Sequence, residues 1–228
     1  MVNTVDFDLT PAIISLKTSL TSTVFTFIIG LFAAWKVANY KGKLKGVIDG
    51  FLTLSLVMPP IVSGFAVLFF VGKKGPLGDL LDKLDTRIIF TWQATVIAAV
   101  VVSFPLMYVT AKGAFEQIDH NILNAARTLG SSETRVFWRV AVPLAWPGIA
   151  AATVLSFARA LGEFGATVFV SGNIPGKTQT IPLALYFAVE SGNYNAAYIW
   201  VLAIFIISLL AMVLVNLLSR NKKIIVRA

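Results

Sequence analysis

The side chains able to do chemistry in this sequence are few, and their types exclude most catalytic and metal sites. The 228 residues include no cysteine and one histidine, His120. Disulfides, thiolate metal sites, iron–sulfur clusters and cysteine nucleophiles are therefore excluded, and so is a two-histidine zinc site within one chain. No segment has the phosphate-binding pattern G-x-x-x-x-G-K-[ST], because Gly72-Lys-Lys-Gly75 lacks its spacing. The sequence predicts no catalytic residue, no metal ligand and no cofactor bound by this chain.

Arg159 and Glu163 lie four residues apart, with Gly162 and Gly165 beside them. On a helix this spacing places both side chains on one face. Such a pair is most often a solvated ion pair worth about 0.3–0.5 kcal/mol, and we favour that interpretation. The alternative is an outer mouth at which an anion or a docking protein meets Arg159.

Two apolar segments, 51–72 and 88–111, contain prolines with hydroxyl side chains near them, and these residues form a candidate translocation path. Its members are Pro59, Pro60, Ser63, Ser103, Pro105 and Thr110. Proline removes an intrahelical hydrogen bond and kinks or breaks a helix, so freed carbonyls and hydroxyls can face a path. The alternative is kinked packing without a path, which membrane helices tolerate.

Membrane helices are the elements that position these residues. Hydrophobic residues make up 57% of the chain, charged residues 13%, and the mean hydropathy is +0.81. A soluble chain of this size cannot bury so much apolar surface, which excludes a cytosolic enzyme, a secreted binding module and a disordered tail. Five segments free of charge are long enough to span a bilayer as helices: 18–35, 51–72, 88–111, 140–158 and 191–219. We expect a single all-α transmembrane domain over residues 1–228.

The positive charge indicates orientation in a membrane rather than nucleic-acid binding. The net charge is +8, and 12 of the 19 basic residues lie in segments 36–50, 112–139 and 220–228. Because basic residues gather in cytoplasmic loops, we expect the N-terminus outside and the C-terminus in the cytoplasm. The N-terminus lacks a basic region, so we expect no cleavable signal peptide. Segment 164–190 is predicted to hold an outer loop and a short helix near 182–190; a sixth, broken span is the alternative.

The longest inner segment is predicted to fold as two short helices at an angle, over about 118–141. Asp119 is suited to cap the first helix, and Gly130 to end it, because a positive φ costs glycine little. Ser131 or Ser132 is suited to cap the second helix, with Glu133 in its first turn. The apolar residues of this segment recur at helical spacing. The alternative is an amphipathic helix that touches only lipid head groups.

This segment resembles the cytoplasmic loop of importer permeases of the ABC class, which has the form E-A-A-x3-G-x9-I-x-L-P. The matching residues are Asn124, Ala125, Ala126, Gly130, Val140, Val142 and Pro143, with Arg127 inside the motif. Asn124 stands where the family usually has Glu, and valine replaces Ile and Leu. The resemblance implies that this pair of coupling helices docks on an ATPase subunit.

The resemblance extends over nearly the whole chain and is strongest to the molybdate permeases of this class. The matching stretches are 58–60, 72–75, 103–106, 126–130, 157–166 and 173–176. The Gly162-Glu-Phe-Gly165 block is also similar to sulfate permeases. The resemblance therefore implies an importer for an oxyanion, with molybdate first and sulfate or tungstate second. A channel that needs no ATP is a further alternative.

The same resemblance implies an architecture and a set of partners. It implies the type I ABC importer permease fold, five transmembrane helices and a location in the bacterial inner membrane. The expected partners are a second copy of this chain, two cytosolic ABC ATPase subunits and an oxyanion-binding protein on the outer side. The chain itself is then a transport subunit, and ATP is hydrolysed on the separate ATPase.

Overall fold

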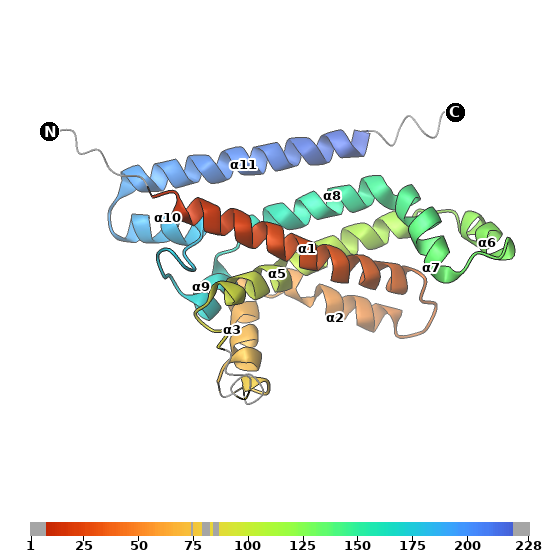
Figure 1. Cartoon of the computed structure of the whole chain (residues 1–228), viewed down its shortest axis with the longest axis horizontal. Coiled ribbons are helices and arrows are strands. Elements are labelled where there is room, and N and C mark those ends of the chain that lie inside the picture. The colour runs from red at the N-terminus through yellow and green to blue at the C-terminus, as the bar shows by residue number, and fades with distance from the viewer. Residues whose placement is uncertain (1–7, 74, 79–82, 84–86, 221–228) are drawn as a thin grey trace.

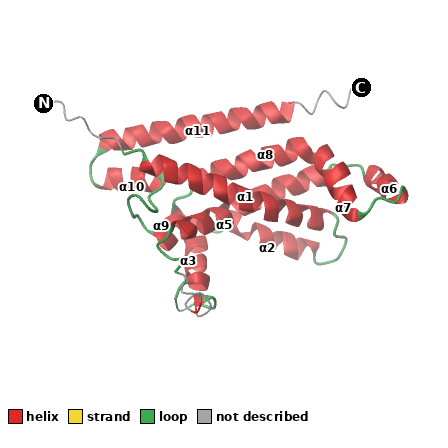
Figure 2. Ribbon diagram, viewed as in Figure 1, coloured by secondary structure: helices red, strands yellow, loops and turns green. Residues whose placement is uncertain are grey.

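The computed structural model describes residues 8–73, 75–78, 83 and 87–220. Within these residues the chain consists of helices joined by loops, with no strand (Figure 2). This agrees with the all-α prediction. The first seven residues and Lys222, Lys223 and Arg227, on which part of the predicted orientation rests, lie outside the described residues.

Four long helical segments correspond to the first, third, fourth and fifth predicted spans. They are α1 (Thr10–Ala38), α5 (Trp92–Glu116), the continuous run of α7 (Glu133–Val136), the π-helical turn η1 (Phe137–Ala141) and α8 (Val142–Leu161), and α11 (Tyr194–Arg220). Each is long and apolar enough to cross a bilayer. Figure 1 shows α1, α5, α8 and α11 running side by side, with α6 (His120–Thr128) at one end and α9 (Gly165–Ser171) and α10 (Ile181–Glu190) toward the other.

The second predicted span, 51–72, is broken rather than kinked. Helix α2 (Lys45–Val57) and helix α3 (Pro60–Val71) meet at 111°, so the described residues hold four spanning helices, or up to five if this pair counts as one. Two consecutive prolines remove two backbone donors, and each proline forces the residue before it into extended backbone. Met58 and Pro59 are accordingly extended, with ψ of 137° and 136°. Helix α3 therefore projects away from the bundle (Figure 1).

Helix α5 continues through Pro105, where the sequence indicates a second interruption. A proline at position 105 leaves the carbonyl of Val101, four residues earlier, without its helical partner. The hydroxyl of Ser55 on α2 donates a hydrogen bond to that oxygen at 2.9 Å. The carbonyl freed by Pro105 is thus satisfied by a neighbouring helix and does not face an open path.

We expect Ser55→Ala to destabilise the folded protein by about 1 kcal/mol, since it leaves the Val101 carbonyl unpaired where water is scarce. Pro105→Ala restores a backbone donor to that carbonyl, so Ser55→Ala should have little effect in a Pro105→Ala background. Unfolding of the four proteins in detergent measures this coupling. An equal loss from Ser55→Ala in both backgrounds would contradict the pairing.

Close approach at small residues packs α5 against its neighbours. A Cβ at Gly30 of α1 would lie 2.8 Å from Cγ of Met107, and one at Gly148 of α8 would collide with the Cβ of Ala114. Lipid tails are as apolar as the helices, so tight packing rather than hydrophobic burial holds such a bundle together. Substitution of Gly30 or Gly148 by larger residues would separate these helices.

Segment 164–190 contains two helices, α9 and α10, which are seven and ten residues long. Helix α10 matches the short helix expected near 182–190. Between them, Gly172 and Gly176 have φ of +63° and +75°. Neither helix is long enough to cross a bilayer by itself.

Candidate functional site

The predicted coupling segment, residues 118–141, begins with helix α6. The ends of this helix are fixed by the local sequence. The carboxylate of Asp119 accepts a hydrogen bond from the backbone N–H of Asn121 at 2.9 Å, which caps the helix. Gly130 follows the last turn with φ of +81°. Its N–H bonds to the carbonyl of Arg127 at 2.9 Å, and the next N–H bonds to Ala126 at 3.1 Å. This pair of bonds is a Schellman C-cap, which needs a left-handed residue at the glycine position.

The second coupling helix differs from the prediction in two respects. Ser132 stands at the cap position of α7, but its side chain makes no capping hydrogen bond. Helix α7 also does not stand alone, because η1 and α8 continue it without a break. One end of the fourth spanning segment therefore itself forms half of the coupling segment.

The coupling segment is anchored to the end of the bundle by apolar side chains. Leu123 is the one buried residue of α6, and Phe137 of η1 is also buried. The ring of Phe137 lies 5.4 Å from that of Trp35 on α1 and 6.1 Å from that of Phe115 on α5. The apolar face of the segment thus packs on α1 and α5, which does not fit a helix that touches only lipid head groups.

The opposite face of α6 is exposed and carries both polar and small residues. Asn124 and Ala125 are exposed, and Ala126 is half-buried. Arg127 makes a two-pronged ion pair with Glu133, at 2.6 and 3.1 Å, and donates a further bond to Asn124 Oδ1 at 3.0 Å. The hydrogen bond from Arg127 to Glu133 raises the pKa of the guanidinium above its usual value. Asn124 therefore helps to orient Arg127, a role that a motif match alone did not indicate.

The remaining motif residues lie where η1 joins α8. Val140 and Val142 are half-buried, and Pro143 is exposed. The link between Arg127 and Glu133 joins the two coupling helices to each other across the Gly130 turn. The arrangement presents a small-residue surface, centred on Ala125, at one end of the molecule.

Glu163 is buried, so its pair with Arg159 is not the solvated ion pair that the sequence favours. Only 2% of the Glu163 side chain is exposed, against 32% for Arg159. One carboxylate oxygen accepts from Arg159 Nη1 at 2.7 Å, and the other accepts from the backbone N–H of Ala166 at 2.7 Å. Glu163 therefore ties the end of α8, which Gly162 caps, to the start of α9.

The start of the candidate path and the candidate outer mouth, which lie about 100 residues apart in the sequence, come together at this point. A Cβ at Gly165 would lie 3.1 Å from Pro60 Cβ, and one at Gly64 would lie 2.6 Å from Cα of Ala166. Helices α3 and α9 thus cross at backbone contact, directly beside the break at Pro59. The start of the candidate path and the candidate outer mouth form one structural unit, which is called the α3–α9 unit and comprises helices α3 and α9 with Pro59, Arg159 and Glu163.

The other path candidates have different surroundings. Ser63 is buried beside the α3–α9 contact, and its hydroxyl has no hydrogen-bond partner among the described residues. Ser103 is buried in α5 and donates to the carbonyl of Ala99 at 2.6 Å. Pro105 is buried in the same helix and Thr110 is half-buried. Pro59, Pro60 and Ser63 therefore gather at one place, whereas Ser103, Pro105 and Thr110 follow along α5.

A comparison of the sequence with models of protein families identifies the family. The family model described as "Binding-protein-dependent transport system inner membrane component" matches residues 26–224. The chain belongs to this family. It is accordingly a multi-pass inner-membrane component of a transport system rather than an enzyme, and the ATPase of such a system is a separate subunit.

Relatives within the family share much of the chain. A protein named putative molybdenum transport system permease protein YvgM, from Bacillus subtilis, is 43% identical over 204 residues, which are 88% of this chain and 89% of that protein. The molybdenum transport system permease protein ModB of Escherichia coli is 41% identical over 84% of this chain and 85% of its own length. A probable sulfate transport system permease, cysT of Chlorokybus atmophyticus, is 31% identical over 94% of this chain and 75% of its own.

Solved structures show the same fold. The chain superposes on a chain of the inward-facing MetNI methionine ABC transporter with a TM-score of 0.67, covering 91% of this chain and 94% of that one at 16% identity. A chain of a bacterial alginate ABC transporter matches with a TM-score of 0.71, covering 95% of this chain and 78% of that one at 15% identity. At this identity the likeness establishes the permease fold alone. The predicted ABC importer permease architecture is confirmed.

Proposed function

We propose that this family member is the membrane subunit of an ATP-driven importer that carries molybdate from a binding protein into the cytoplasm. The observation that carries the proposal is the identity of 43% and 41% to two molybdenum permeases, over more than four-fifths of each chain. Sulfate is the second candidate, since the sulfate relative is 31% identical over 94% of this chain. Tungstate, as a near analogue of molybdate, belongs with them.

In this proposal two copies of the chain form the pore, and each coupling segment docks on one of two ATPase subunits. The N-terminus lies outside and the C-terminus lies in the cytoplasm, in accord with the excess of basic residues in segments 36–50 and 112–139. Helix α6 then faces the cytoplasm, and the α3–α9 unit lies toward the outer surface. Closure of the ATPases brings the coupling segments together and reverses the pore from inward-facing to outward-facing by movement of rigid parts.

The residues about α3 and α9 suit the outer part of the path. Ser63 supplies a hydroxyl without a partner among the described residues, and Arg159 supplies a guanidinium that is one-third exposed and already neutralised by Glu163. Such a lining offers hydrogen bonds to a dianion without a strong fixed charge that would hold it. Gly162 is exposed at the same place, whereas Gly165 lets α9 approach α3 closely.

The proposal is tested with the complete complex of permease, ATPase and binding protein in proteoliposomes. We expect radiolabelled molybdate to cross the membrane only when ATP is supplied on the side of the ATPase, and unlabelled molybdate and tungstate to compete better than sulfate. Competition by sulfate at equal or lower concentration would transfer the assignment to sulfate. Uptake that proceeds without ATP would identify a channel and refute the importer.

A further inference from the structure

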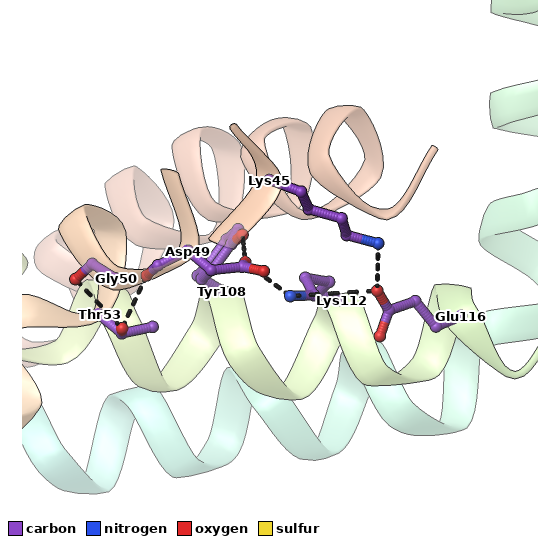
Figure 3. Close-up of polar contacts among 7 residues, drawn as sticks. All are labelled: Lys45, Asp49, Gly50, Thr53, Tyr108, Lys112 and Glu116. Carbon is purple, nitrogen blue, oxygen red and sulfur yellow. Dashed lines mark hydrogen bonds and ion pairs between the residues drawn. The ribbon is translucent and has the colours of Figure 1, made fainter. Parts of the chain in front are cut away.

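A strip of charged and polar side chains joins α2 to α5, and neither the coupling segment nor the path accounts for it. Figure 3 shows Lys45 and Asp49 of α2 pointing toward Tyr108, Lys112 and Glu116 of α5. Lys112 Nζ lies 2.6 Å from Asp49 Oδ1, and Lys45 Nζ lies 2.9 Å from Glu116 Oε1. The hydroxyl of Tyr108 donates to the same oxygen of Asp49. These five residues are called the α2–α5 strip.

The strip is regular and electrically balanced. Its members recur every four residues on each helix, so they occupy one face of α2 and one face of α5. Two lysines face two carboxylates, and Lys112 also lies 4.0 Å from Glu116. The side chains of Lys112 and Asp49 are only 17% and 27% exposed. An unpaired charge costs more at that burial than on the open surface, so the pairs favour one alignment of the two helices.

Helix α2 has little else to hold it in that alignment. Among its 13 residues none is buried, and Ile48 and Leu52 alone pack partly against the central apolar cluster. Phe51 and Val57 are 76% and 86% exposed. An apolar face gains nothing by leaving lipid for another apolar face, so polar contacts decide where such a helix sits. The second polar contact is the bond from Ser55 to the Val101 carbonyl near the outer end of α2.

The strip lies between the coupling segment and the break at Met58 and Pro59. The inner end of α5 leads through three residues to α6, the first coupling helix. The outer end of α2 leads to the break at Met58 and Pro59, and α3 beyond it packs on α9. When the end of α5 next to α6 is displaced, the break at Met58 and Pro59 therefore moves with it only if α2 moves together with α5.

We propose that Asp49 and Lys112 are positioning residues that lock α2 to α5, so that movement of the coupling segment is transmitted to the break at Pro59 and to the α3–α9 unit. The inference rests on the proposed function, because it assigns the strip a part in coupling ATP hydrolysis to transport. It requires the pairing to persist through the cycle, with α2 and α5 moving as one body.

The test measures molybdate uptake per ATP hydrolysed by the complete complex in proteoliposomes. Asp49→Asn keeps the size of the side chain, removes the 2.6 Å ion pair and leaves Lys112 only the longer contact with Glu116, at 4.0 Å. We expect ATP hydrolysis within about twofold of the unsubstituted complex and uptake per ATP lowered at least about fivefold. Reversal of all four charges, K45E, D49K, K112D and E116K together, restores both ion pairs with opposite sign. It should recover uptake per ATP to within about threefold.

Lys43→Gln is the matched control, because Lys43 is an exposed lysine in the turn before α2 and lies outside the strip. It should leave the ratio unchanged. If Asp49→Asn does not assemble with the ATPase, Lys112→Gln replaces it, since it removes the same ion pair from the α5 side and leaves Asp49 bonded to Tyr108. An unchanged ratio in the substituted complex, or a charge reversal as uncoupled as Asp49→Asn, overturns the inference. Absence of ATP-dependent uptake in the unsubstituted complex would instead refute the proposed function.

Discussion

Gly130→Asp is expected to lower ATP-driven molybdate uptake by at least about tenfold, while Gly192→Asp leaves it within about twofold. Gly130 lies on the exposed surface of the coupling segment, and a Cβ there would meet no atom of this chain within 4 Å. Within the permease the added carboxylate therefore meets no steric clash, and the left-handed φ of +81° is its one source of strain. It would instead enter the contact with the ATPase, where the proposal requires a close approach.

Gly192 is a closely matched control because it ends α10 as Gly130 ends α6. Their φ angles are +76° and +81°, and a Cβ added at either glycine would meet no atom within 4 Å. In both turns the glycine N–H bonds to the carbonyl three residues earlier, at 3.0 Å for Gly192 and 2.9 Å for Gly130. The N–H of the next residue bonds to the carbonyl five residues earlier, at 2.8 Å after Gly192 and 3.1 Å after Gly130. Aspartate in the left-handed region then costs the same in each, about 1 kcal/mol.

The two variants differ in place, since α6 and α10 lie toward opposite ends of the bundle (Figure 1). Co-purification of the ATPase with the permease is the direct measurement, and uptake per ATP is the second. Loss of the ATPase from Gly130→Asp alone supports docking at this turn. Equal losses from both variants would assign the effect to the strained turn, and unchanged uptake in Gly130→Asp would refute docking there.

Local rules are enough to place the coupling helices from the sequence. The cap at Asp119 and the left-handed turn at Gly130 depend on residues within five positions, and both occur as expected. The long apolar runs likewise predict spanning helices, because crossing a bilayer requires about 20 apolar residues whatever they pack against. The continuation of α7 into α8 does not follow from such rules, since a capping serine followed by glutamate indicates a new helix start and carries no information on its end.

The features that sequence reasoning missed depend on partners distant in the chain. A proline pair predicts an interruption, but the angle of 111° depends on the packing of α3 against α9. The continuity of α5 at Pro105 depends on Ser55, which lies 46 residues from the Val101 carbonyl it satisfies. The sequence places Asp49 among the charges of an inner segment, yet it is half-buried against α5. Spacing along one helix cannot reveal the helix that lies opposite.

Glu163→Ala is expected to lower uptake by at least about tenfold and to destabilise the end of the fold that carries α3 and α9 by about 2–3 kcal/mol. The carboxylate makes two bonds of 2.7 Å, one to Arg159 and one to the N–H of Ala166. Its loss leaves that buried N–H unpaired and frees α9 from the end of α8. Because Ala166 touches Gly64, the disturbance passes directly to α3 and the break at Pro59.

Glu163→Gln separates the two bonds. The amide oxygen still accepts from Ala166, whereas the charge that balances Arg159 is lost. Arg159 is one-third exposed and keeps part of its hydration, so the glutamine variant should lose less stability than the alanine variant, by about 1 kcal/mol or more. Glu190→Ala, at the exposed end of α10, removes an exposed carboxylate outside this unit and should change neither uptake nor stability. If the alanine and glutamine variants unfold alike in detergent, the ion pair with Arg159 holds α9 in place, and the bond from Glu163 to the Ala166 N–H does not. If Glu163→Ala matches Glu190→Ala in uptake, the α3–α9 unit has no part in transport.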